Sequence, residues 1–283
     1  MSKLSAFTTV TLPEKRCDPW KEAITNYLDF FDEVVVVCGH KSDEPLIHAE
    51  FGDKVKTVYS EWPHTWDWNE LPKHFNMGLE KCTGDVIVRL DIDYFIHEAD
   101  KEWFKIYIDA FSKSEAYIAR TVKFNVMNKN VGMIKSRIPN IINAKYKDRI
   151  TFGKAVNKNT DWTVPLVNFG GCRKPRFEVL DDDRMPLLRI RMYNYDYFFK
   201  TEEITKAEFW RFAQAYETKE KKGEWSWGAT EEKAWGYWRN MMEGRLRRSG
   251  EGILSHPKYI RDRIKNMPEE EFGNKNFNLI MYR

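Results

Sequence analysis

The chain has 283 residues, of which 42% are hydrophobic and 31% are charged, and its formal net charge is +3. This composition is that of an ordinary folded domain and excludes an intrinsically disordered chain. The small net charge lacks the clustered basic excess that is typical of dedicated DNA-binding proteins. No apolar run reaches the roughly 18 to 20 residues of a transmembrane helix, and MSKLSAFTT lacks a signal-peptide pattern. We therefore expect a soluble, cytoplasmic protein without a transmembrane segment.

The cysteine and aromatic residues give further information about the class of protein. The four cysteines are far apart and form no C-x-x-C pair, which excludes a zinc ribbon: Cys17, Cys38, Cys82 and Cys172. They are typical of free thiols in a reducing cytosol. The aromatic share is 15%, with 11 Trp, and a surplus beyond the needs of the core would suit a surface that stacks on sugar rings or bases.

Strand and helix patterns alternate along the N-terminal part of the chain. The predicted strands are residues 4–10, 34–37, 55–59 and 86–90. Helices are expected after Asp18-Pro19, where Asp18 can act as N-cap, over residues 69–81, and after Asp100. The run Val34–Val37 is continuous and β-branched, as in a strand buried on both faces. This order predicts an α/β fold with a doubly wound, mostly parallel sheet.

The second half is less regular. Residues 115–170 contain short β runs, and residues 186–194 predict a strand. Two helices are expected over about 202–221 and 230–248 because Gly223 and Ser249-Gly250 end their patterns. No repeat or Pro/Gly-rich linker divides the chain, so we expect one domain over residues 1–283.

Two carboxylates follow the strand at 86–90 directly. Ligands of open α/β sheets bind beyond the carboxyl ends of the strands, and Asp91 and Asp93 lie at such an end. Alternation in an extended segment would point both side chains the same way. Two hard oxygen ligands with open remaining positions suit Mg²⁺ or Mn²⁺ bridging a diphosphate, whereas solvated acids in a turn are the plain alternative.

The sequence around these acids resembles the family 2 type of GT-A glycosyltransferases. The resemblance rests on Asn76-x-Gly78, on Thr83-Gly84-Asp85, on the strand that ends in Asp91-Ile92-Asp93, and on Phe31–Val37 followed by Ser42-Asp43. It covers roughly residues 4–98. It implies a GT-A fold with a nucleotide-diphosphate sugar donor, UDP-sugar favoured, a divalent metal, and inversion at the anomeric carbon. Cys38-Gly39 replaces the acidic residue that commonly contacts the nucleobase, which leaves Asp43 or backbone groups for that contact.

The resemblance also implies roles for further residues. Residues 1–112 would form the half that binds nucleotide-sugar and metal, and residues 113–283 an acceptor-side half with C-terminal helices. The expected donor-binding residues are Thr8, Asp43, Asn76, Arg89 and Asp91. Glu231 and Glu232 resemble the acidic pair that supplies the catalytic base, although acids also suit a first helical turn. His256 would be a third metal ligand beside Asp91 and Asp93, although a lone His is more often structural.

Several alternatives stay open. Asp181–Asp183 is a rival for the base. Trp225 and Trp227, with Trp62, Trp66 and Trp68, could form an acceptor-stacking surface, whereas Trp235, Trp238 and Met242 fit the core face of their helix. The acceptor is expected to be a glycan or lipid-linked saccharide. Hydroxymethylated DNA bases, as in bacteriophage DNA modification, a non-catalytic GT-A-like binding module, and a nucleotidyltransferase are the other hypotheses. The sequence does not define the oligomeric state.

Overall fold

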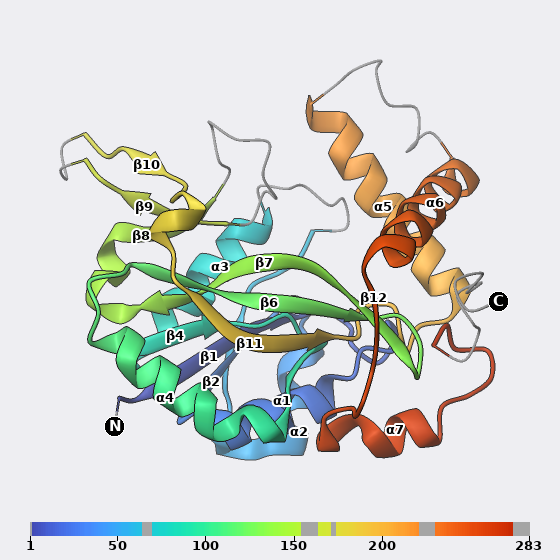
Figure 1. Cartoon of the computed structure of the whole chain (residues 1–283), viewed down its shortest axis with the longest axis horizontal. Coiled ribbons are helices and arrows are strands. Elements are labelled where there is room, and N and C mark those ends of the chain that lie inside the picture. Colours follow the sequence, from blue (N-terminus) through green and yellow to red (C-terminus); the bar gives the residue numbers. More distant parts are fainter. Residues whose placement is uncertain (1, 64–69, 154–163, 171–173, 221–229, 274–283) are drawn as a thin grey trace.

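The computed structural model describes residues 2–63, 70–153, 164–170, 174–220 and 230–273. One large sheet lies at its centre (Figure 1). Its strands, in spatial order, are β3 (Lys56–Tyr59), β2 (Glu33–Cys38), β1 (Leu4–Val10), β4 (Val86–Arg89), β7 (Val131–Asn143), β6 (Ile118–Val126), β11 (Leu187–Asn194) and β5 (Tyr94–Ile96). The short strand β12 (Gly250–Gly252) pairs with β7 outside this order.

The strand directions define the fold class. Strands β3, β2, β1 and β4 run parallel, and β7 is antiparallel to both β4 and β6. Strand β11 is parallel to β6 and antiparallel to β5. Every residue of β2 is buried, as expected for a β-branched strand with both faces covered. The predicted α/β class, with a mostly parallel sheet flanked by helices, is confirmed.

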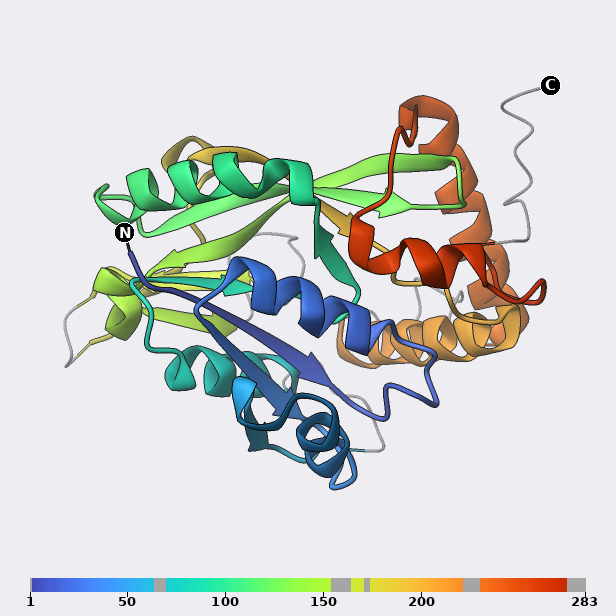
Figure 2. The same ribbon diagram turned by 90° about the horizontal axis from the view of Figure 1, so that it is seen from below.

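Helices cover both faces of this sheet (Figures 1 and 2). The larger core lies on the face covered by α1 (Trp20–Phe30), α4 (Lys101–Ser112) and the short α7 (Arg261–Lys265). On the opposite face, α3 (Glu70–Lys81) packs against β1 and β2. Gly78 permits this approach because a Cβ there would lie 2.5 Å from Cδ2 of Phe7.

A smaller sheet and a pair of helices complete the molecule. The strands β8 (Ile150–Gly153), β9 (Val164–Asn168) and β10 (Phe177–Glu178) form an antiparallel sheet. Helices α5 (Glu202–Glu220) and α6 (Glu231–Ser249) pack side by side at one end of the large sheet (Figure 1). The remaining elements are helix α2 (Asp43–Phe51) and the 3-10 turns η1 (Gly52–Lys54), η2 (Glu98–Asp100), η3 (Ala144–Arg149), η4 (Asp182–Arg184) and η6 (Lys258–Ile260).

Two predicted helix caps are wrong. Helix α1 has no side-chain cap bond, and the Asp18 carboxylate pairs with Arg16 and Lys200. The Asp100 side chain likewise makes no cap bond to α4. Asp18 is held by its ion pairs, whereas Asp100 occupies the N-cap position of α4 with φ −89° and ψ −2°, outside the β-region backbone that N-cap residues typically adopt. Helix α2 was not predicted, because its sequence carries no clear apolar stripe.

The cysteines of the described residues are free thiols. Cys38 and Cys82 are buried free thiols, burial raises the pKa of each to about 12, and Cys17 is also free. Cys172 lies outside the described residues. Among the helices that the structure describes, none combines the length and the hydropathy needed to span a lipid bilayer.

Candidate donor and metal site

The D-x-D segment lies in a turn at the carboxyl end of β4. Strand β4 ends at Arg89, and the N–H of Tyr94 donates to the carbonyl of Asp91 at 2.9 Å as β5 begins. The hydroxyl of Tyr27 in α1 donates to the same carbonyl at 2.6 Å. Asp91 and Asp93 therefore lie beyond the end of a parallel strand, as predicted. They lie in a turn, however, and not in the extended segment from which we expected both side chains to point the same way.

The turn gives the two carboxylates different surroundings. The Asp91 side chain is 36% exposed, and its Oδ1 lies 3.4 Å from Nη2 of Arg89. Asp93 is 7% exposed, and its Oδ1 is buried without a hydrogen-bond partner among the described residues. Burial raises the pKa of Asp93 well above its usual range, and the charges of Asp196 and Asp91 add to this effect. A buried carboxylate oxygen without a partner is costly unless a ligand supplies one.

Asp196 joins this site from the other half of the chain. Strand β5 pairs with β11, so the N–H of Tyr195 donates to the carbonyl of Asp93 at 3.0 Å. Asp196 follows directly, and its side chain is 33% exposed. Among the charges around Asp93, that of Asp196 contributes most to its pKa. Sequence reasoning missed Asp196. Its position just after a predicted strand, as for Asp91, was the available signal.

A buried lysine holds the acidic residues around the site together. The Lys200 side chain is 1% exposed, and its Nζ lies 2.7 Å from Glu208, 3.2 Å from Asp18 and 3.7 Å from Asp196. Arg16 Nε adds a second cation, 3.1 Å from both Asp18 and Glu208. The network thereby links the loop after β1, the end of β11 and helix α5.

The site fits a divalent cation that the substrate helps to bind. In the described ranges, no three His, Cys, Asp or Glu side chains come together as a metal-ligand group. Asp91 and Asp93 offer two hard oxygen donors, one of them the unpartnered Oδ1 of Asp93. Mg²⁺ is commonly held by one or two carboxylates together with substrate phosphates and water. Two protein ligands are therefore sufficient for a metal that arrives with a diphosphate.

The other expected donor-binding residues mostly serve the fold. Thr8 is buried inside the sheet at 1% exposure. Asp43 is fully buried, and its two oxygens accept from the N–H groups of Leu12 and His40. Asn76 uses its amide to hold β8, since it accepts from Phe152 N–H at 2.7 Å and donates to Phe152 O at 3.0 Å. Arg89 faces the site through its contact with Asp91.

The Asp43 contacts still bear on a donor site. They tie the loop after β1 to the loop after β2, at the carboxyl ends of two parallel strands. Asp43 therefore shapes the backbone where a nucleobase would bind. Its oxygens are already in use, so backbone groups are the better candidates for the base contact.

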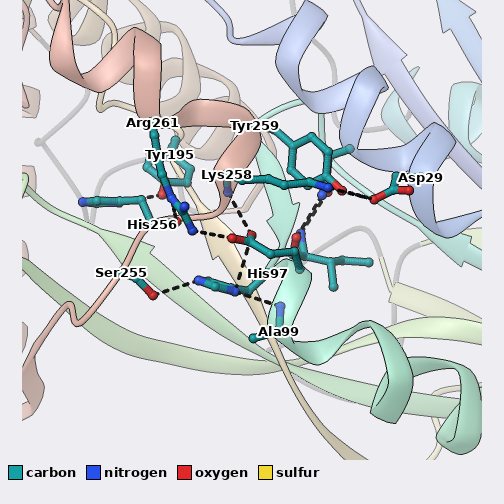
Figure 3. A network of polar contacts seen from close by, with 12 residues as sticks. Asp29, His97, Ala99, Tyr195, Ser255, His256, Lys258, Tyr259 and Arg261 are labelled. Carbon is teal, nitrogen blue, oxygen red and sulfur yellow. Dashed lines mark hydrogen bonds and ion pairs between the residues drawn. The ribbon is translucent and has the colours of Figure 1, made fainter.

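His256 does not form the expected three-ligand group with Asp91 and Asp93. Its Nε2 donates to the carbonyl of Lys129 at 2.9 Å, so its Nδ1 accepts from the Tyr195 hydroxyl at 2.8 Å (Figure 3). Burial lowers the pKa of His256, which favours this neutral ring. Both ring nitrogens are occupied, so the role of His256 in this structure is to hold Tyr195, the residue between β11 and Asp196.

The segment around His256 fastens the C-terminal part of the chain to the strand that follows the D-x-D turn. His97, next to β5, contacts Ser255 at 2.9 Å between Nε2 and Oγ (Figure 3). Glu98 accepts from the N–H of Lys258 at 2.9 Å and pairs with Arg261. These contacts fasten residues 97–98 to the segment 255–261.

Glu231 and Glu232 lie in a separate groove on α6. The groove has a volume of about 460 Å³, and its lining contains no residue of the D-x-D turn: Lys206, Glu231, Glu232, Trp235, Gly236, Arg239, Asn240 and Glu243. The predicted base pair is thus not brought to Asp91 and Asp93 in the described residues. The rival acid Asp182 pairs with the buried Arg120 and serves the fold.

The predicted tryptophan surface is described only in part. Trp62 stacks on His74 with ring centroids 4.6 Å apart. Trp66, Trp68, Trp225 and Trp227 lie outside the described residues. Trp238 and Met242 are buried in the core, as expected, whereas Trp235 is only partly buried and lines the groove.

The strand order defines an α/β protein with one large, mostly parallel sheet, and an acidic turn follows β4. No family model matches the chain, and no curated protein matches it in sequence. Among solved structures it is similar to S. aureus TarS 1–349, with 13% identity, 93% of this chain and 82% of that chain covered, and a TM-score of 0.41.

Two further structures show the same kind of similarity. For TarS 1–349 in complex with UDP-GlcNAc the identity is 17%, and 54% of this chain and 50% of that chain are covered, with a TM-score of 0.38. For glucosyl-3-phosphoglycerate synthase from Mycobacterium tuberculosis with Mn²⁺, UDP and phosphoglyceric acid, the identity is 12%, the coverage 44% and 43%, and the TM-score 0.29. The chain thus spans about half the length of these two relatives.

Proposed function

We propose that this protein is a metal-dependent glycosyltransferase that moves a sugar from a nucleotide-diphosphate sugar, UDP-sugar favoured, to an acceptor hydroxyl of a glycan. The observation that carries the proposal is the acidic turn at the carboxyl end of β4, where the buried Asp93 Oδ1 has no partner among the described residues. The donor class and the inversion at the anomeric carbon are what the sequence resemblance implies.

Asp91 and Asp93 would hold Mn²⁺ or Mg²⁺ together with the donor diphosphate. A metal bound there would supply Lewis-acid stabilisation of the charge on the leaving diphosphate. Arg89 orients Asp91 through the 3.4 Å contact. Tyr27, which donates to the Asp91 carbonyl, fixes the backbone of the turn.

The acceptor hydroxyl must lose a proton as its oxygen attacks the anomeric carbon, and a carboxylate near the reacting atoms can accept it. Asp196 lies beside Asp93, is one-third exposed and, unlike Asp91, is not needed to hold the metal. Its neighbour Lys200 lies 3.7 Å away and holds the carboxylate beside the turn. We assign the base to Asp196 in place of Glu231 and Glu232.

A donor screen tests the proposal. Wild type and the double variant Asp91→Ala/Asp93→Ala are incubated with UDP-, GDP-, CDP- and dTDP-sugars, with Mn²⁺ or with EDTA, and released nucleoside diphosphate is measured. We expect one donor to be hydrolysed only by wild type and only with the metal. Release of pyrophosphate would indicate a nucleotidyltransferase, and equal rates for wild type and variant would refute the metal site.

A further inference from the structure

The groove on α6 has the size and the chemistry of a ligand site. Its volume of about 460 Å³ lies within the roughly 300 to 1,000 Å³ that is typical of small-molecule sites. One helix, α6, provides most of the lining, and Lys206 of α5 provides one wall. None of the residues that line the groove holds the donor or the metal in the proposed reaction.

The groove presents hydrogen-bonding groups of both kinds. Lys206 and Arg239 can only donate, whereas the carboxylates Glu231, Glu232 and Glu243 can only accept. Lys206 is paired with Glu202 at 2.8 Å, and Arg239 with Glu243 at 3.4 Å. Among the described residues, the side chains of Glu231 and Glu232 make no hydrogen bond or ion pair.

This mixture selects against ions and in favour of hydroxyl groups. A polyanion such as nucleic acid would face three carboxylates, and a polycation would face Lys206 and Arg239. A hydroxyl group both donates and accepts, so a neutral polyhydroxyl ligand satisfies both sets of side chains. The acidic pair therefore suits the binding of sugar hydroxyls.

An aromatic wall adds the apolar part of such a site. Trp238 stacks on Trp235 with ring centroids 4.9 Å apart and an interplanar angle of 18°, and Nζ of Lys206 lies 5.5 Å from the centroid of the Trp235 ring. Trp235 is partly buried. Its remaining surface lines the groove, where it offers the amphipathic contact that indole rings provide to ligands with an apolar face and polar edges. Trp238 also lines the small cavity to which Asp196 belongs, so the groove adjoins the reacting site through this stacked pair.

A glycine keeps the groove open. Gly236 lies inside α6, where glycine is about 1 kcal/mol less favourable than alanine. A Cβ at Gly236 would meet nothing within 4 Å, so the glycine is not required for packing. Any larger side chain there would occupy the groove itself.

We propose that the groove formed by Trp235, Gly236, Glu231 and Glu232 binds a neutral saccharide, as the site that holds the acceptor glycan. The identification of this saccharide as the acceptor rests on the proposed function. Binding by the groove itself does not depend on the metal site.

The chain offers a matched pair of variants. Gly236→Leu fills the groove, whereas Gly244→Leu adds the same side chain to the same helix outside it, and a Cβ at Gly244 also meets nothing within 4 Å. Both changes replace a helical glycine by a better helix former, so both variants should fold. Circular dichroism and thermal unfolding verify this before binding is measured.

The test is retention on a printed array of neutral oligosaccharides. Wild type and Gly244→Leu should bind at least one glycan, and Gly236→Leu should bind it at least about tenfold less, as expected for the loss of one aromatic contact and its hydrogen bonds. Asp91→Ala/Asp93→Ala should bind it like wild type, which separates the groove from the donor site. Absence of any glycan binding by wild type, equal binding by Gly236→Leu, or duplex DNA binding that only Gly236→Leu loses would overturn the proposal.

Discussion

Replacing Lys200 by Met should lower the free energy of unfolding by about 3 to 5 kcal/mol, the usual cost of removing one partner from a buried ion pair. Lys200 is 1% exposed and contacts Glu208, Asp18 and Asp196. Methionine preserves most of the volume but leaves these carboxylates with Arg16 as the remaining cation of the network. Urea unfolding monitored by circular dichroism measures the difference.

Lys113→Met is the matched control for this experiment. Lys113 forms an ion pair with Asp109 on the surface of α4, with 71% of its side chain exposed. Its loss should change the free energy of unfolding by less than about 1 kcal/mol, as for other exposed pairs. If Lys200→Met were as mild as Lys113→Met, the network would not hold β11 and α5 in place.

Asp196→Asn should reduce the kcat of metal-dependent donor hydrolysis by about 10² to 10⁴, the usual contribution of a general base. In this assay water takes the place of the acceptor, so no acceptor has to be known. The amide has the shape of the carboxylate but cannot accept the proton. Because Asp91 and Asp93 are unchanged, the KM for the donor should stay within a few-fold of wild type.

The control for this variant is Glu231→Gln/Glu232→Gln. These residues line the groove and not the D-x-D turn, so the double variant should hydrolyse the donor at nearly the wild-type rate. The opposite outcome would be a normal rate for Asp196→Asn and a large loss of rate for the glutamate pair. It would show that Glu231 or Glu232 is the base, as the sequence resemblance implies.

The sequence was sufficient to predict the parallel half of the fold. Val34–Val37 and Val86–Val88 are continuous apolar runs, helical spacing of apolar residues identified α1 and α4, and residues 69–81 were also expected to be helical, as α3 is. These signals are local, because burial on both faces or along one stripe is present in the residues themselves. The position of Asp91 and Asp93 beyond a strand followed from the same pattern.

The rest of the site depends on contacts between distant residues. Asp196 lies beside Asp93 only because β5 pairs with β11, and no local sequence pattern predicts this pairing. Asp43 and Asn76 match positions of the family motif. Their side chains, however, accept hydrogen bonds from the backbone N–H groups of Leu12, His40 and Phe152. Helical spacing placed Trp235 on the core face, but the packing of α5 against α6 leaves it at the edge of a groove.

The most direct test of the central claim is a calorimetric titration of UDP into wild type and Asp91→Asn/Asp93→Asn, each with Mn²⁺ and with EDTA. We expect wild type to bind UDP at least about tenfold more tightly with Mn²⁺ than with EDTA, a difference of about 1.4 kcal/mol, because the cation would offset the negative charge of the diphosphate. The double variant should show no effect of Mn²⁺. UDP binding that is the same in all four titrations, or no binding of UDP with Mn²⁺ present, would contradict a metal-dependent nucleotide-sugar site at the D-x-D turn.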